Sequence, residues 1–245
     1  EILRCLVGSE MCIRDSDINF GIGKGKLIGL LGPSGSGKTT ILRMLAGLEH
    51  ADSGEIIIDG RVVNDVPASE RGIGFVFQNY ALFRYMTVYD NIAFGLDVKK
   101  WKKADIRRRV DELVELVGLK GFEKRYPNQL SGGQRQRAWI AMTLAQETEM
   151  ILLDEPTTYL DMAYQLDVLQ LLERMNREKQ LTIVMVLHDL NEACRFADHI
   201  IGLKNGKVVC EGKPADVITR ENIREIYGID AKLVMSDGGY PICME

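Results

Sequence analysis

The sequence lacks the features that mark several large classes of protein. None of its apolar runs approaches the roughly 20 residues that a membrane-spanning helix requires, so we expect a soluble chain. Its five cysteines show no metal-like spacing, which favours unpaired thiols in a reducing compartment. Basic residues are not in excess: 31 Lys and Arg against 35 Asp and Glu give a formal net charge of −4, which argues against nucleic-acid binding. Internal repeats and low-complexity tracts are also missing.

What the sequence does contain is an alternation of short apolar runs with helical patterns. This alternation predicts an α/β fold with a mostly parallel sheet and flanking helices. We expect one domain over residues 17–228, with a core at about 17–80 and 146–212, a helix-rich insert at about 81–145, and a C-terminal tail at 229–245. Five apolar residues of the insert fall on one helical face: Ile106, Val110, Leu113, Val114 and Val117.

A glycine-rich segment after the apolar run 27–31 has the pattern of a phosphate-binding loop. It fits G-x-x-x-x-G-K-[ST] at every fixed position and leads into a helix through Thr40. Its residues are Gly32, Pro33, Ser34, Gly35, Ser36, Gly37, Lys38 and Thr39. The glycines allow the backbone to wrap the phosphates of a nucleotide, and the helix directs its positive N-terminal end at them. We expect Lys38 to reach the β- and γ-phosphates and the Thr39 hydroxyl to ligate Mg²⁺. An ordinary glycine-rich turn is the alternative, which the complete motif in this context disfavours.

Two carboxylates follow a second apolar run, at residues 150–153. Asp154 and Glu155 stand at the end of this expected strand, where ligands bind in open α/β sheets. We expect Asp154 to hold Mg²⁺, through water, and Glu155 to act as the general base on the attacking water. The alternative is that both carboxylates cap a turn. The phosphate loop already requires a metal partner, which favours the catalytic interpretation.

A third segment, Leu130-Ser131-Gly132-Gly133-Gln134, gives the chain its family resemblance. With the two preceding motifs, it makes residues 17–228 resemble the ATPase subunit of ATP-binding cassette transporters. The resemblance implies a P-loop NTPase core with a helical subdomain inserted between the Q-loop and the signature segment, and it implies hydrolysis of ATP with Mg²⁺.

The same resemblance implies roles for further residues. Gln78 looks like the Q-loop glutamine that contacts the metal. Ser131 and Gly133, beside Gln134, look like the signature residues that touch the γ-phosphate held by the opposite subunit. Asp161 looks like the D-loop aspartate at the dimer seam, and His188 like the switch histidine that senses the γ-phosphate. Alone, His188 and Gln78 would be ordinary polar residues, but their order and spacing weigh against chance.

The implied partners follow from the family's way of working. Two ATPs are sandwiched in a head-to-tail dimer, and membrane permease subunits dock near residues 80–94. A solute-binding protein acts indirectly, and the ATPase lies peripherally at the cytoplasmic face of the membrane. The alternatives are a non-transport cassette ATPase of DNA repair or translation, a simple P-loop kinase, and an inactive misassembled product. The signature segment argues against the kinase.

Two parts of the chain depart from a uniform family pattern. Residues 1–16 show no strand or helix pattern, and 5–16 resemble an in-frame translated sequencing adapter, so we expect no structure there. The family's adenine-stacking aromatic aligns near Ser9, and its loss would cost about 1–3 kcal/mol of ATP binding. The N-terminal half resembles sulfate and polyamine importers, whereas the C-terminal half resembles iron–siderophore importers. We therefore hypothesise a chimera joined at 130–137, with the solute open between an iron–siderophore and a sulfate-like anion.

Overall fold

The computed structural model describes residues 10–14, 18–77, 82–158 and 160–244. The strands are β1 Glu10–Arg14, β2 Asn19–Gly23, β3 Leu27–Leu31, β4 Glu55–Ile58, β5 Arg61–Val62, β6 Ile73–Val76, β7 Met150–Leu153, β8 Thr182–Val186, β9 His199–Lys204, β10 Lys207–Gly212, β11 Lys232–Met235 and β12 Pro241–Met244. The helices are α1 Lys38–Ala46, α2 Val88–Val98, α3 Lys103–Leu116, α4 Gly132–Leu144, α5 Met162–Lys179, α6 Leu190–Phe196, α7 Pro214–Val217 and α8 Arg220–Tyr227, with 3₁₀ turns at Ala68–Glu70 and Pro127–Gln129.

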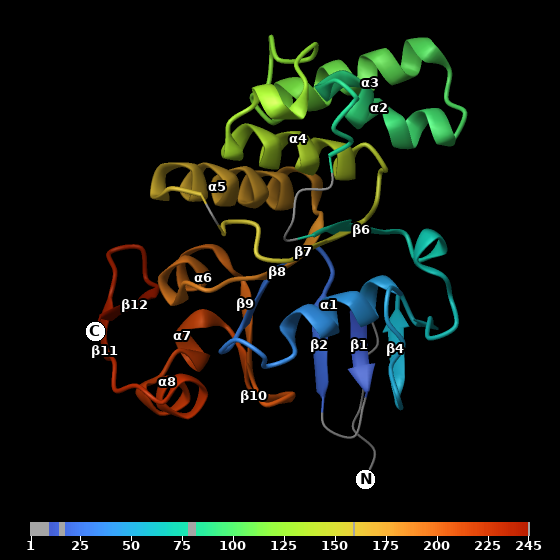
Figure 1. The fold of residues 1–245 in the computed structure, drawn as a ribbon. Helices are drawn as coiled ribbons and strands as arrows, with labels where there is room; N and C mark the ends of the chain where they lie inside the picture. The colour runs from blue at the N-terminus through green and yellow to red at the C-terminus, as the bar shows by residue number, and fades with distance from the viewer. Residues whose placement is uncertain (1–9, 15–17, 78–81, 159, 245) are drawn as a thin grey trace.

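The centre of the fold is a six-stranded sheet in the order β10-β9-β3-β8-β7-β6 (Figure 1). Every neighbouring pair is parallel except β9 and β10. Strands β3 and β8 are buried along their whole length, as apolar strands covered on both faces must be. This arrangement confirms the predicted α/β class with a mostly parallel sheet.

Side chains alternate between two cores, one on each face of this sheet. Ile28 and Leu30 of β3 pack with α1 and the smaller antiparallel sheet. Leu27 and Leu31 of the same strand belong to the core that contains α2 to α6. Because successive side chains of a strand point to opposite faces, one apolar strand supports both layers. The phosphate loop therefore starts from a strand that is packed on both faces.

The N-terminal region differs from the expectation of unstructured chain. Residues 10–14 form β1, which pairs antiparallel with β2 on one side and β4 on the other. It is thus an inner strand of the four-stranded sheet β2-β1-β4-β5. Its backbone groups are bonded along both edges, and this long-range pairing decides the structure where the local side-chain pattern gives no signal.

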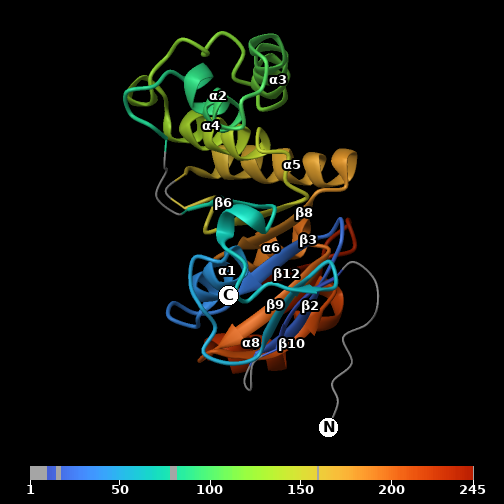
Figure 2. The same ribbon diagram turned by 90° about the vertical axis from the view of Figure 1, so that its right-hand side faces the viewer.

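Helices α2, α3 and α4 form the helix-rich insert between β6 and β7 (Figure 2). Helix α3 begins at Lys103 and ends at Leu116, and its predicted apolar face is buried. Gly118, with φ of 68°, follows directly and ends the helix, because only glycine adopts this conformation at little cost. Within the described residues, no helix combines the length and the apolar character needed to cross a membrane.

The C-terminal residues, expected as a tail, form a two-stranded antiparallel hairpin of β11 and β12. Strand β12 packs against α6 on the flank of the central sheet (Figure 1). Side chains from the hairpin, including Leu233 and Tyr240, lie against the larger core. The end of the described chain is therefore integrated into the fold.

Candidate nucleotide site

The phosphate loop connects the buried end of β3 to the first turn of α1. Gly35 and Gly37 have φ of 78° and 95°, values that suit glycine in a tight turn. The ammonium of Lys38 donates to the carbonyl oxygens of Gly32 and Pro33, both at 2.8 Å. Its side chain is almost completely buried, and this burial lowers the pKa of Lys38 against the opposing charges of Glu155 and Asp154. The free N–H groups of α1 and this ammonium together form an anion site.

Gly32 fixes the loop against the central sheet. A Cβ at this position would lie 2.2 Å from the carbonyl oxygen of Leu203 in β9 and 2.7 Å from the Ser36 hydroxyl. The amide of Gly206, just after β9, donates to the carbonyl oxygen of Ser36 at 3.2 Å. The loop is thus held between two neighbouring strands, and it takes its position from the sheet.

Thr39 and Asp154 meet across the end of the sheet, as the sequence predicts. The Thr39 hydroxyl donates to Asp154 Oδ1 at 2.9 Å, and the amide of Asp154 donates to the carbonyl oxygen of Val76 at 2.9 Å. Asp154 is buried, which raises the pKa of its carboxyl, while the hydrogen bond from Thr39 opposes this rise.

This pair of oxygen donors fits Mg²⁺. Magnesium is held in nucleotide sites by one or two protein oxygens, with waters and substrate phosphates completing its shell. Among the described residues, no group of three or more His, Cys, Asp or Glu side chains forms a separate metal site. Gln78, the third expected ligand, lies outside the described residues.

Glu155 and His188, each expected at the site from the sequence, lie next to each other in the structure. His188 Nε2 lies 2.6 Å from Glu155 Oε1, and the Thr158 hydroxyl donates to Glu155 Oε2 at 3.2 Å. Glu155 has φ of 52°, an unfavourable conformation for a residue with a side chain. Such strain is found at functional sites where the surroundings hold it. Here the histidine and the threonine fix both carboxylate oxygens.

Ser131 and Asp161 are the N-caps of α4 and α5, and these helices lie on the side of the sheet opposite α1 (Figure 2). Ser131 caps α4: its hydroxyl accepts from the Gln134 amide at 3.3 Å, and Gln134 Oε1 accepts from the Ser131 amide at 3.0 Å. Asp161 caps α5 by accepting from the Tyr164 amide at 3.2 Å. A Cβ on Gly133 would lie 3.0 Å from the Tyr164 ring. Within the described residues, the starts of α4 and α5 therefore contact each other, and the hydrogen bonds of Ser131 and Asp161 do not reach the phosphate loop.

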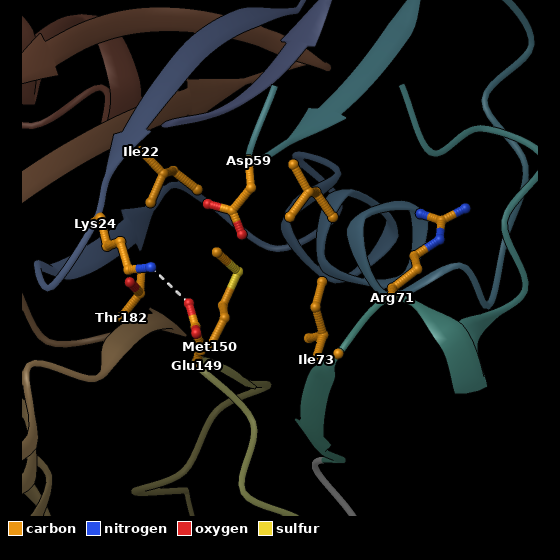
Figure 3. Close-up of a pocket in the computed structure, with 10 residues that line it drawn as sticks. Ile22, Lys24, Asp59, Arg71, Ile73, Glu149, Met150 and Thr182 are labelled. Carbon is orange, nitrogen blue, oxygen red and sulfur yellow. Dashed lines mark hydrogen bonds and ion pairs between the residues drawn. The ribbon is translucent and has the colours of Figure 1, made fainter. Parts of the chain in front are cut away.

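A small cavity of about 40 Å³ lies at the opposite end of the strands from the phosphate loop (Figure 3). Met150 and Thr182, which begin β7 and β8, line it, and Lys24 and Glu149 form an ion pair of 2.6 Å beside it. Nucleotides bind at the carboxyl ends of parallel strands, whereas this cavity lies at their amino ends and has room for little more than water. This cavity is therefore not a candidate for nucleotide binding.

Glu192 in α6 was not anticipated from the sequence. Its Oε2 accepts from the Thr157 hydroxyl at 3.4 Å, which links α6 to the loop that follows Glu155. Burial, followed by the nearby charge of Asp189, raises the pKa of Glu192 to about 7, and the Thr157 hydrogen bond opposes this rise. The structure places Glu192 in the first turn of α6, and the sequence carries no signal for its contact with Thr157. Ser9, where the adenine-stacking aromatic was expected, lies outside the described residues.

The fold and this site define a nucleotide-binding protein of the P-loop class. The family model described as ABC transporter matches residues 16–158, and the chain belongs to this family. It is 50% identical over 200 residues to the sulfate/thiosulfate import ATP-binding protein CysA of Mycobacterium bovis. The aligned segment covers 82% of this chain and 57% of that protein.

Two solved structures are similar in fold. The first is a dimeric post-hydrolysis state of the ATP-binding cassette MJ0796 bound to ADP and Pi, with 35% identity, a TM-score of 0.72, and coverage of 84% of this chain and 96% of that one. The second is cbiO1 from Clostridium perfringens, part of the ABC transporter complex cbiONQ, with 28% identity and a TM-score of 0.77. The match covers 88% of this chain and 92% of that one.

Proposed function

We propose that this chain is the ATP-hydrolysing subunit of an importer. The main observation in support is that Glu155 and His188, whose Oε1 and Nε2 atoms are 2.6 Å apart, lie beside the Thr39–Asp154 pair and the phosphate loop. The chain spans 57% of the length of the curated relative it matches, a sulfate/thiosulfate import protein. That relative favours a sulfate-like anion as the solute, with an iron–siderophore as the alternative from the C-terminal half.

The residues divide the reaction between binding and proton transfer. Lys38 and the N-terminal end of α1 bind the β- and γ-phosphates of ATP. Glu155 takes the proton of the attacking water, and His188 orients the Glu155 carboxylate and faces the γ-phosphate. Thr39, Asp154 through water, and Gln78 would hold Mg²⁺, and the bound ion would supply positive charge against the charge that develops on the phosphates.

A second copy completes the site in this proposal. Ser131, Gly133 and Gln134 begin a helix away from the phosphate loop of their own chain, so another positive helix end is available to the γ-phosphate of a partner. Asp161, which packs with that segment, lies at the same seam. Two head-to-tail copies then enclose two ATP molecules.

The membrane subunits have a candidate docking cleft on the helical insert. A cleft of about 770 Å³ is lined by Leu82, Arg84, Tyr85 and Tyr126, among others, and Tyr85 is 95% exposed. An exposed aromatic at a cleft rim is typical of a protein interface. We propose that permease subunits bind here, which keeps the ATPase peripheral at the cytoplasmic face and leaves the solute-binding protein to contact the permease alone.

The test compares two variants of the purified chain. Glu155→Gln is expected to retain ATP and to accumulate a dimer, while turnover falls by about 10²- to 10⁴-fold. Lys38→Ala is expected to abolish nucleotide binding. Analytical ultracentrifugation with and without ATP, together with phosphate release, measures both. Unchanged turnover in Glu155→Gln, or full turnover by a strictly monomeric protein, would overturn the proposal.

A further inference from the structure

Helix α6 starts immediately after the switch histidine. Asp189 caps this helix by accepting from the amides of Asn191 at 2.6 Å and Glu192 at 3.0 Å. His188 therefore stands one residue before a fixed helix end, and any shift of α6 moves the imidazole relative to Glu155.

The Asn191 side chain of α6 makes two hydrogen bonds to the C-terminal hairpin, which also packs against this helix. Asn191 Nδ2 donates to the carbonyl oxygen of Cys243 at 3.1 Å, and the amide of Cys243 donates to Asn191 Oδ1 at 2.7 Å. The amide side chain thus satisfies both backbone groups of one β12 residue, as a neighbouring strand would. Cys243 is also paired with Leu233 in the hairpin, so the attachment reaches both strands.

The next residue attaches α6 to the catalytic loop. Glu192 accepts from Thr157, and Thr158 donates to Glu155. Thr157 is buried and its carbonyl oxygen accepts from Gln165 of α5 at 3.2 Å, which fixes the loop from the other side. Two consecutive residues of one helical turn therefore connect the hairpin, the switch histidine and the general base.

We propose that Asn191 and Glu192 are positioning residues through which docking of the C-terminal hairpin sets the geometry of the Glu155–His188 pair. The inference rests on the proposed ATPase function. It makes the hairpin a part of the hydrolytic apparatus, although none of its residues touches ATP.

The experiment uses the full chain with Asn191→Ala, Thr157→Val and the double variant. Asn222→Ala is the matched control, because Asn222 bonds the Val217 carbonyl at 2.7 Å and, within the described residues, its side chain bonds neither α6 nor the hairpin. We expect Asn191→Ala and Thr157→Val each to lower kcat by about tenfold, and up to 10²-fold, with an unchanged KM for ATP, because displacement of a catalytic pair by 1 Å has effects of this size. The double variant should lose little more than the stronger single variant, because both act on one helix.

A conservative variant and a melting curve separate positioning from general stability. Asn191→Asp keeps the acceptor for the Cys243 amide and should recover part of kcat, and this variant is the test if Asn191→Ala does not fold. The inference fails if Asn191→Ala keeps the wild-type kcat, if kcat is lost only in proportion to unfolded protein, or if Asn222→Ala loses as much. Absence of ATP hydrolysis in the wild type, with ATP binding unaffected by Lys38→Ala, would instead refute the proposed function itself.

Discussion

Replacing Gly32 by alanine tests whether the phosphate loop takes its position from the sheet. The new Cβ would lie 2.2 Å from the Leu203 carbonyl oxygen, about 1.2 Å short of the 3.4 Å at which ordinary contact begins. Leu203 is completely buried in β9, so the loop has to move. Overpacking of this kind costs about 1–3 kcal/mol, and a side chain at this φ of 149° costs about 1–3 kcal/mol more.

Gly35→Ala is the matched variant within the same loop. Gly35 also has positive φ, 78°, but a Cβ there would meet nothing within 4 Å. Only the backbone cost of about 1–2 kcal/mol applies, which predicts a Tm loss of about 2–8 °C for a chain of this size. Gly21→Ala, in β2 with open space and ordinary φ, should melt at or slightly above the wild-type temperature.

The assay is thermal melting of each variant with and without saturating ATP. Gly32→Ala should lose roughly two to three times the stability that Gly35→Ala loses, and its Tm should no longer rise with ATP, because a displaced loop no longer directs its amides at the phosphates. If Gly32→Ala melts within about 2 °C of Gly35→Ala, the contact with Leu203 does not position the loop and the reasoning fails.

Three further predictions concern charge, metal and packing. Burial raises the pKa of Glu192 from 4.5 to about 7, so the folded chain holds a proton that the unfolded chain releases, and this carboxyl makes stability fall as pH rises through that interval. The Tm of Glu192→Gln minus that of the wild type should therefore increase from about pH 5 to about pH 8. An equal Tm difference at these two pH values would contradict this. Thr39→Val should raise the Mg²⁺ concentration that gives half-maximal ATP hydrolysis at fixed ATP, and an unchanged titration curve would remove Thr39 as a ligand. Trp139→Ala deletes a side chain that is 1% exposed and should cost about 3–5 kcal/mol in urea unfolding; a loss below about 1 kcal/mol would show that the core of the insert closes around the gap.

The sequence predicts those elements whose structure is determined by residues within or next to them. Strands β3, β7 and β8 are short continuous apolar runs, and the sheet buries them on both faces. The phosphate loop follows from its complete motif, and the end of α3 from Gly118. These signals lie within a few residues of what they determine, so no knowledge of tertiary contacts is needed.

What the sequence does not predict depends on partners far along the chain. Residues 10–14 form strand β1 because β2 and β4 pair with its two edges, and no sequence pattern in these residues predicts a strand. The bond from Asn191 to Cys243 spans 52 residues, and that from Thr157 to Glu192 spans 35. The positive φ of Glu155 is likewise a result of its surroundings, because a glutamate has no local preference for it.

In the proposed dimer, the signature segment of one copy would complete the nucleotide site of the other. Ser131 and Gln134 bond each other's amides, which leaves the Ser131 O–H and the first amides of α4 as donors at the exposed start of a helix. A side chain at Gly133 would also crowd the contact between the starts of α4 and α5, because its Cβ would lie 3.0 Å from the Tyr164 ring. Asp161 caps the helix that carries Tyr164, so the starts of α4 and α5 move together. In the proposed dimer, a phosphate held by the second copy would meet these donors at the start of α4, while Gln165 of α5 bonds the Thr157 carbonyl oxygen in the loop beside Glu155.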